Sequence, residues 1–141
     1  MERSTAVVVD SGPLVSFIDR RDPDHERCLA LFERFRGLVV VPILTVAEVS
    51  HLVGRRLHVD AELSFLADIV IGNFTVESVH PSDWLRIAEL VEQYGDLPLG
   101  TVGASVVAAA ERLGVSTIAT LDRRHFSVVR PAHVEAFELV P

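Results

Sequence analysis

The chain has 141 residues, of which 49% are hydrophobic and 23% charged, so it can bury a sizeable core and is not a disordered segment. This length predicts one domain over residues 1–141. The thirteen basic residues are all arginine and the acids number twenty, which gives a net charge of −7 and excludes nucleic-acid binding through bulk positive charge. The lack of lysine also excludes a phosphate-binding P-loop and Schiff-base chemistry.

Cysteine content and hydropathy indicate the compartment. The single cysteine, Cys28, excludes a disulfide framework and a cysteine-based zinc site, and we expect it in the core. Asp10 interrupts the first apolar segment too early for a signal peptide, and no apolar run approaches the ~18 residues of a membrane span. We therefore expect a soluble, cytoplasmic protein that makes no membrane contact.

Short valine- and isoleucine-rich segments alternate with longer amphipathic segments, which is typical of a parallel sheet covered by helices on both faces. In chain order, the predicted strands lie near 6–9, 38–41, 74–77, 117–120 and 136–139. The predicted helices cover 22–37, 45–56, 60–71, 82–94 and 101–113. Asp22 should cap the first of these helices, with Pro23 in its first turn. The pattern predicts the α/β fold class.

Two of the helices carry patterns that predict how they pack. Trp84, Ala88 and Val91 recur at helical spacing, so we expect them on the buried face of helix 82–94. Helix 101–113 is apolar on almost every side and stops before Gly114, which predicts burial beside the sheet and a glycine cap.

Three carboxylates follow predicted strands closely. Asp10 follows the first strand, Asp122 follows the fourth, and Glu48 lies in the expected first turn of the helix after the second. In open α/β sheets, ligands bind beyond the carboxyl ends of the strands. Converging carboxylates repel one another unless protons or divalent cations neutralise them, and Mg²⁺ or Mn²⁺ in such sites supports phosphodiester hydrolysis.

Each of these acids also has a purely structural interpretation. Asp10 could end its strand in a turn before Gly12 and Pro13. Glu48 could complete a capping box with Thr45, and Asp122 could cap a short helical turn over 123–126. From the residues alone, these alternatives stay open.

Four motifs in fixed order carry a resemblance to a known family: VVDSGPL at 8–14, VAEV at 46–49, YGDLPLG at 94–100 and TLDRRHF at 120–126. Over residues 7–131 the sequence resembles PIN domains, specifically the VapC-type toxins of type II toxin-antitoxin systems. The resemblance implies a three-layer α/β/α fold around a central parallel sheet. It also implies a Mg²⁺- or Mn²⁺-dependent endoribonuclease, a homodimer, and a cognate VapB antitoxin that blocks the site.

The resemblance places the metal ligands, and hence the catalytic acids, at Asp10, Glu48 and Asp122. Asp96 belongs to the third motif and is either a further ligand or a cap for the helix that follows it. Gly103 stands where such toxins usually carry an aspartate, so one acid of the site is missing. We therefore expect low activity, through an acquired inactivating change or in a naturally degenerate toxin.

Polar residues beside the acids complete the predicted site. The hydroxyls of Ser11 and Thr120 are expected to donate to the neighbouring carboxylates, and His125 to bond locally. Arg123 and Arg124 are candidate RNA-binding residues, because guanidinium groups pair well with phosphate. The arginine pairs at 20–21 and 55–56 are further candidates for a positive rim, although arginines at a helix end commonly face solvent.

Two functions follow from this site. The leading hypothesis is an endoribonuclease toxin that cleaves tRNA, rRNA or mRNA through a metal-activated water and is attenuated by Gly103. The alternative is a catalytically inactive module that binds RNA and antitoxin within a toxin-antitoxin complex, and metal-dependent cleavage distinguishes the two. An α/β phosphatase or signalling domain is a third class, against which the missing lysine counts.

Overall fold

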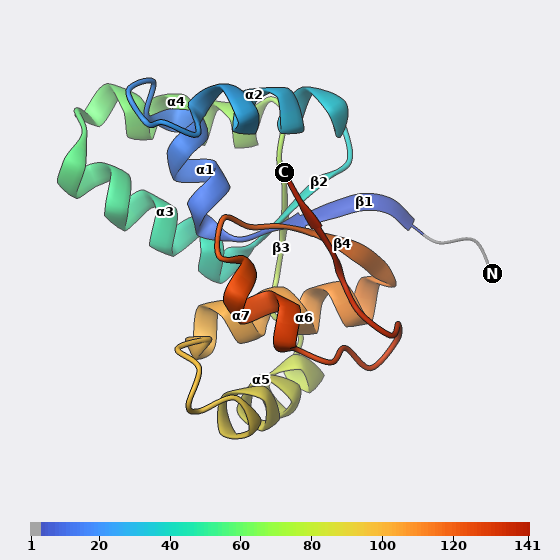
Figure 1. Cartoon of the computed structure of the whole chain (residues 1–141). Helices are drawn as coiled ribbons and strands as arrows, with labels where there is room; N and C mark the ends of the chain where they lie inside the picture. The colour runs from blue at the N-terminus through green and yellow to red at the C-terminus, as the bar shows by residue number, and fades with distance from the viewer. Residues whose placement is uncertain (1–3) are drawn as a thin grey trace.

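The computed structural model describes residues 4–141 as a five-stranded sheet between two layers of helices (Figure 1). All strand pairs are parallel, and the order across the sheet is β3-β2-β1-β4-β5. The strands are β1 (Ser4–Val9), β2 (Val39–Pro42), β3 (Thr75–Glu77), β4 (Val115–Ala119) and β5 (Glu138–Val140). The predicted three-layer α/β/α fold and all five predicted strands are confirmed.

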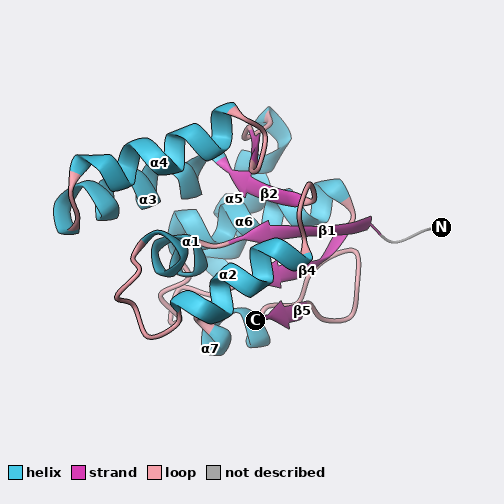
Figure 2. Ribbon diagram, turned by 90° about the horizontal axis from the view of Figure 1, so that it is seen from above, coloured by secondary structure: helices cyan, strands magenta, loops and turns pink. Residues whose placement is uncertain are grey.

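Figure 2 shows the sheet from above, with helices before and behind it. One layer contains α1 (Ser11–Ile18), α2 (His25–Arg34), α3 (Ile43–Arg56) and α4 (Val59–Val70). The other contains α5 (Pro81–Gln93), α6 (Gly100–Leu113) and α7 (Arg123–Val128). No helix within residues 4–141 is both long enough and apolar enough to cross a membrane.

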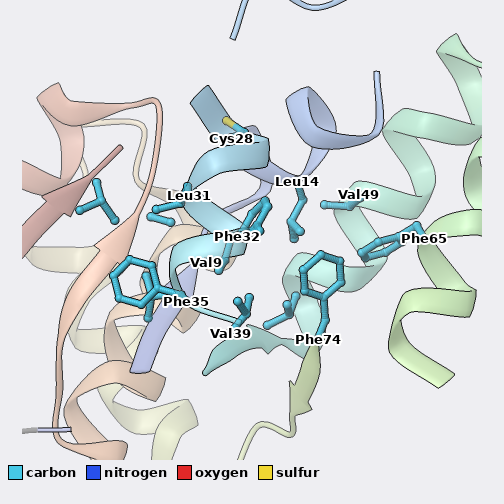
Figure 3. Close-up of a cluster of buried hydrophobic side chains, with 14 of the residues drawn as sticks. Val9, Leu14, Cys28, Leu31, Phe32, Phe35, Val39, Val49, Phe65 and Phe74 are labelled. Carbon is cyan, nitrogen blue, oxygen red and sulfur yellow. The ribbon is translucent and has the colours of Figure 1, made fainter. Parts of the chain in front are cut away.

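Alternation along the strands builds a separate core on each face of the sheet. Val7 and Val9 of β1 point into the core under α1 to α4, whereas Val8 points into the core under α5 to α7. Phenylalanines pack edge to face in the first core, where the ring centroids of Phe32 and Phe74 are 5.4 Å apart. Figure 3 shows both side chains within this core. Cys28 is fully buried there, as the sequence predicted.

Helix α6 confirms its predicted burial, because every residue over 103–110 is buried and Gly114 ends the helix with a φ of 69°. Helix α5 differs from the prediction. Its buried face carries Ile87, Leu90 and Asp83, while Trp84 is 49% exposed. The reason is an ion pair that the helical pattern could not reveal, since Arg112 of α6 bonds the Asp83 carboxylate at 3.1 Å.

Two predicted helix starts are wrong. Helix α2 is preceded by Asp24 rather than capped by Asp22, whose carboxylate accepts a hydrogen bond from the Asp24 amide at 2.8 Å. Helix α3 begins at Ile43, directly after β2, rather than at Thr45. This earlier start moves Glu48 from the first turn of the helix into the second.

The strand order creates a crevice at the carboxyl ends of the central strands. From β1 the chain steps outward through β2 to β3, and then returns to place β4 on the other side of β1. The connections that leave β1 and β4 therefore diverge to opposite faces, which opens a crevice beyond their carboxyl ends.

Candidate active site

A cleft of about 850 Å³ opens at the carboxyl ends of β1 and β4. Its wall is formed by the β1–α1 junction, one side chain of α3, the start of α6, and the β4–α7 junction. The lining residues are Asp10, Ser11, Gly12, Glu48, Pro98, Leu99, Gly100, Thr101, Val102, Gly103, Leu121, Asp122, Arg123, Arg124, His125 and Phe126. All three predicted catalytic acids thus reach one cleft from distant parts of the sequence.

Asp10 links β1 to α1 and directs its carboxylate into the cleft. Its amide donates to the Ala119 carbonyl at 2.9 Å, which extends the pairing of β1 with β4. Its Oδ2 accepts a hydrogen bond from Thr120 Oγ1 at 3.1 Å, and it makes no side-chain cap of α1. The alternative of a simple turn is wrong, because helix α1 begins at the next residue, Ser11.

Glu48 faces the cleft from the second turn of α3. Ser11 Oγ donates to its Oε1 at 2.6 Å. The alternative capping box is wrong, because Pro42 precedes the helix and Thr45 is fully buried. The Thr45 hydroxyl has no hydrogen-bond partner within the described residues 4–141.

Asp122 precedes α7 at the far side of the cleft. Its amide donates to Thr120 Oγ1 at 2.9 Å, while its carboxylate contacts His125 Nδ1. No side-chain cap of α7 is formed, so the alternative role as a helix cap is wrong. Both hydroxyls expected beside the acids do donate to carboxylates, and His125 bonds locally as predicted.

The three acids affect one another electrostatically. Burial raises the pKa of Asp10 above its ordinary value of 3.8, the charges of Glu48 and Asp122 raise it further, and hydrogen bonds from the Ser11 amide and Thr120 oppose the rise. Across the described residues, no three His, Cys, Asp or Glu side chains are grouped closely enough to ligate one metal ion. The expectation that the three acids lie close enough to share a metal is therefore not met for direct ligation by all three, and each carboxylate bonds a separate donor.

Gly103 lies near the start of α6 and lines the same cleft as the three acids. A Cβ at this position would lie 2.8 Å from Leu99 Cδ1 and 3.2 Å from Leu99 Cγ. The buried side chain of Leu99 therefore covers the space that an acid at 103 would enter. Sequence reasoning missed Leu99, although its spacing of four residues from Gly103 on one helix face was a usable signal.

The sequence pattern of the PIN domain matches residues 7–130. The chain belongs to the PIN-domain family. It is 33% identical over 135 residues to Ribonuclease VapC26 of Mycobacterium tuberculosis, covering 96% of this chain and all of that protein. It is thus a homologue of the VapC ribonuclease toxins.

Solved structures of other PIN-domain toxins share this fold. VapC20 of Mycobacterium tuberculosis, described as a toxin that cleaves the sarcin-ricin loop, superposes with a TM-score of 0.80 at 18% identity, over 92% of this chain and 99% of that one. VapBC2 of Rickettsia felis, bound to a DNA fragment from its promoter, gives a TM-score of 0.67 at 14% identity, over 96% and 97% of the two chains.

The other predicted site residues of this PIN domain divide into those at the cleft and those away from it. Asp96 is exposed in the loop before α6 and is not among the residues that line the cleft. It does not cap α6 either, because Leu99 occupies the cap position and no side-chain cap bond forms there. Arg123 and Arg124 do line the cleft, whereas Arg20 and Arg21 lie outside its lining.

Proposed function

We propose that this chain, as one domain over residues 1–141, is a divalent-metal-dependent endoribonuclease toxin of the VapC type. The observation that carries the proposal is the meeting of Asp10, Glu48 and Asp122 in one open cleft at the carboxyl edge of the sheet. The 33% identity to a protein named as a ribonuclease supports RNA as the substrate.

The chemistry of the donor set fits Mg²⁺ or Mn²⁺, because three carboxylates supply the hard oxygen ligands that these ions prefer. Asp10, Glu48 and Asp122 would hold the ion in part through the waters that Mg²⁺ retains, because they are not grouped closely enough for all three to ligate it directly. A bound divalent cation would neutralise the acids and activate a water for attack on a phosphodiester. We keep Asp96 out of this ligand set, because it is exposed and lies outside the cleft lining.

The neighbouring side chains orient the acids. The hydroxyls of Ser11 and Thr120 donate to Glu48 and Asp10, and each bond restricts the rotation of one carboxylate. His125 does the same for Asp122. Such contacts fix ligand orientation before a metal arrives, and their loss typically costs metal affinity.

Gly103 attenuates this activity in our proposal. The residue contributes no oxygen to the cleft, so three carboxylates remain rather than four. Three acids can hold one hydrated Mg²⁺, but a second ion that would stabilise the leaving oxygen lacks ligands.

The same observations favour a second candidate function. The three acids are not assembled as a closed ligand set, and an apolar side chain covers the position of the missing fourth acid. A chain of this kind could bind RNA and a VapB-type antitoxin without cutting RNA. In either function we propose a homodimer that acts in the cytoplasm and is blocked by its antitoxin. Toxin-antitoxin assemblies among the structural relatives support the antitoxin partner.

Cleavage assays separate the two candidates. The purified chain is incubated with labelled tRNA, mRNA and a sarcin-ricin-loop RNA in Mg²⁺, Mn²⁺ or EDTA, with Asp10→Asn as the control for contaminating nuclease. Cutting that requires metal and Asp10 supports the nuclease. RNA that stays intact while it binds the chain supports the binding module.

A further inference from the structure

Two adjacent arginines begin helix α7 beside Asp122. Arg123 and Arg124 are the only arginines among the described residues that line the cleft, and both are exposed. Their hydrogen bonding is nevertheless different, and this difference separates their roles.

The Arg123 side chain donates its hydrogen bonds within the protein. Its Nη2 donates to the Leu139 carbonyl at 3.1 Å and to the Pro141 carbonyl at 2.7 Å. These two bonds use both hydrogens of that nitrogen and fix the planar guanidinium against the end of β5. A turn toward a ligand would break both bonds, so Arg123 ties α7 to the sheet.

The remaining side chains of this segment, Arg124 excepted, are also engaged. Asp122 and His125 contact each other, and Phe126 is buried in the second core. Arg124 is exposed and makes no side-chain hydrogen bond or ion pair with any part of the chain that the structure describes. Of the two arginines that line the cleft, it alone has a guanidinium with no partner among the described residues.

The character of the cleft determines what this free cation would bind. Three carboxylates repel an approaching phosphodiester, so a positive group beside them is required to hold the RNA backbone. The lining offers no exposed Phe, Tyr or Trp on which a base could stack, because Phe126 is buried. We infer that Arg124 binds an RNA phosphate at the rim of the acidic cleft, while Arg123 is a positioning residue that fixes α7. This inference rests on the proposed action on RNA.

Salt-dependent RNA binding tests the assignment. All variants carry Asp10→Asn to prevent cleavage, and the anisotropy of a short fluorescein-labelled RNA is measured in Mg²⁺ over a salt series. Arg124→Gln should weaken binding about 10-fold at low salt and reduce the slope of log Kd against log salt by about 0.7, the value of one phosphate contact on a single strand. Arg124→Lys should keep the slope, because it keeps the charge.

Two matched variants complete the test. Arg123→Gln should keep the slope but lower Tm by about 3 °C, since it releases α7 from β5. Arg130→Gln removes an exposed arginine outside the cleft and should change neither quantity. The inference is overturned if Arg124→Gln leaves the slope of log Kd against log salt unchanged. It is also overturned if Arg123→Gln reduces that slope as much as Arg124→Gln does. If the parent binds RNA in this way but the chain with Asp10 intact never cuts RNA, the inference stands and only the nuclease proposal is removed. A parent that binds no RNA overturns both.

Discussion

Thr120 Oγ1 donates a hydrogen bond to Asp10 Oδ2 at 3.1 Å and accepts one from the Asp122 amide at 2.9 Å. A single hydroxyl, 1% exposed, thus joins the two acids that follow β1 and β4. The bridge crosses the switch point of the sheet, where the proposed metal would lie.

Replacement of Thr120 by valine should weaken the site while preserving side-chain volume. Thr120→Val removes the donor to Asp10 and leaves the Asp122 amide without its acceptor, which should destabilise the fold by about 1–3 kcal/mol. Affinity for Mn²⁺, measured by calorimetry, should fall about 10- to 100-fold. Thr120→Ser keeps the hydroxyl and serves as the control. Equal Mn²⁺ affinity in the valine variant and the parent would contradict the bridging role.

Asp10 should make folding stability depend on pH. Because burial raises its folded-state pKa above 3.8, its contribution is fully favourable below that value and is lost as the pH rises through the raised pKa. Asp10→Asn, which keeps an oxygen acceptor for Thr120, should therefore raise Tm near neutral pH in EDTA. The gain should shrink as the pH falls toward about 4. Asp96→Asn, at an exposed acid outside the cleft, is the control, and a lower Tm for Asp10→Asn at neutral pH would refute the argument.

Cys28 should be unreactive in the folded protein. The side chain is fully buried, and burial together with the nearby Asp24 charge raises the thiol pKa to about 11. The thiolate that attacks a disulfide reagent is therefore scarce and inaccessible at pH 8. We expect Ellman's reagent to label the chain only after urea unfolds it, and because this is the single cysteine, the signal reports on that site alone. Rapid labelling without urea would show that the first core opens locally.

Replacement of the buried Thr45 by valine should stabilise the protein. Its buried hydroxyl has no partner within residues 4–141, so the group loses hydration without compensation. Thr45→Val keeps the shape and should raise the free energy of unfolding by about 1 kcal/mol in urea titrations. Thr45→Ala removes the hydroxyl and a methyl group, and should gain less because it leaves a small void. A loss of stability in the valine variant would reveal a partner for the hydroxyl in solution.

Gly103→Asp should strengthen metal binding and raise RNA cleavage, because it adds a carboxylate to the lining of the cleft that holds the other acids. A Cβ at 103 would lie only 2.8 Å from Leu99 Cδ1, so the Leu99 side chain must move to admit the aspartate. We expect a loss of about 1–3 kcal/mol in urea unfolding, as in other overpacked sites.

Gly103→Asn and Gly103→Ala are the matched controls for this change. Both meet Leu99 as aspartate does, but neither adds a charge, so they should lose stability without gaining activity. Adding Leu99→Ala to Gly103→Asp should relieve the crowding and keep the cleavage. Unchanged metal affinity in Gly103→Asp would remove position 103 from the site and favour the binding module.

The sequence allowed the sheet and the meeting point of the acids to be predicted, since strand periodicity and the strand-end rule need only local patterns. The sequence also predicted that Ser11 and Thr120 donate to carboxylates, but not which carboxylate each hydroxyl bonds. Ser11 and Glu48 are 37 residues apart, and Thr120 and Asp10 are 110 apart, so only the folded chain brings them together. Local rules predicted helix caps for Glu48 and Asp122. A distant partner, Ser11, bonds Glu48 instead, whereas the carboxylate of Asp122 contacts its near neighbour His125.

The packing of Leu99 over Gly103 also affects whether proteases and chaperones recognise this chain as damaged. Proteases and chaperones respond to exposed apolar surface and to voids, and here a neighbouring side chain leaves neither at the position of the missing acid. Under the proposed function, the chain would therefore accumulate like a toxin with all four acids and bind the same antitoxin. Selection for folding alone would favour the glycine, because an aspartate at 103 crowds Leu99, and only a demand for catalysis would favour the aspartate.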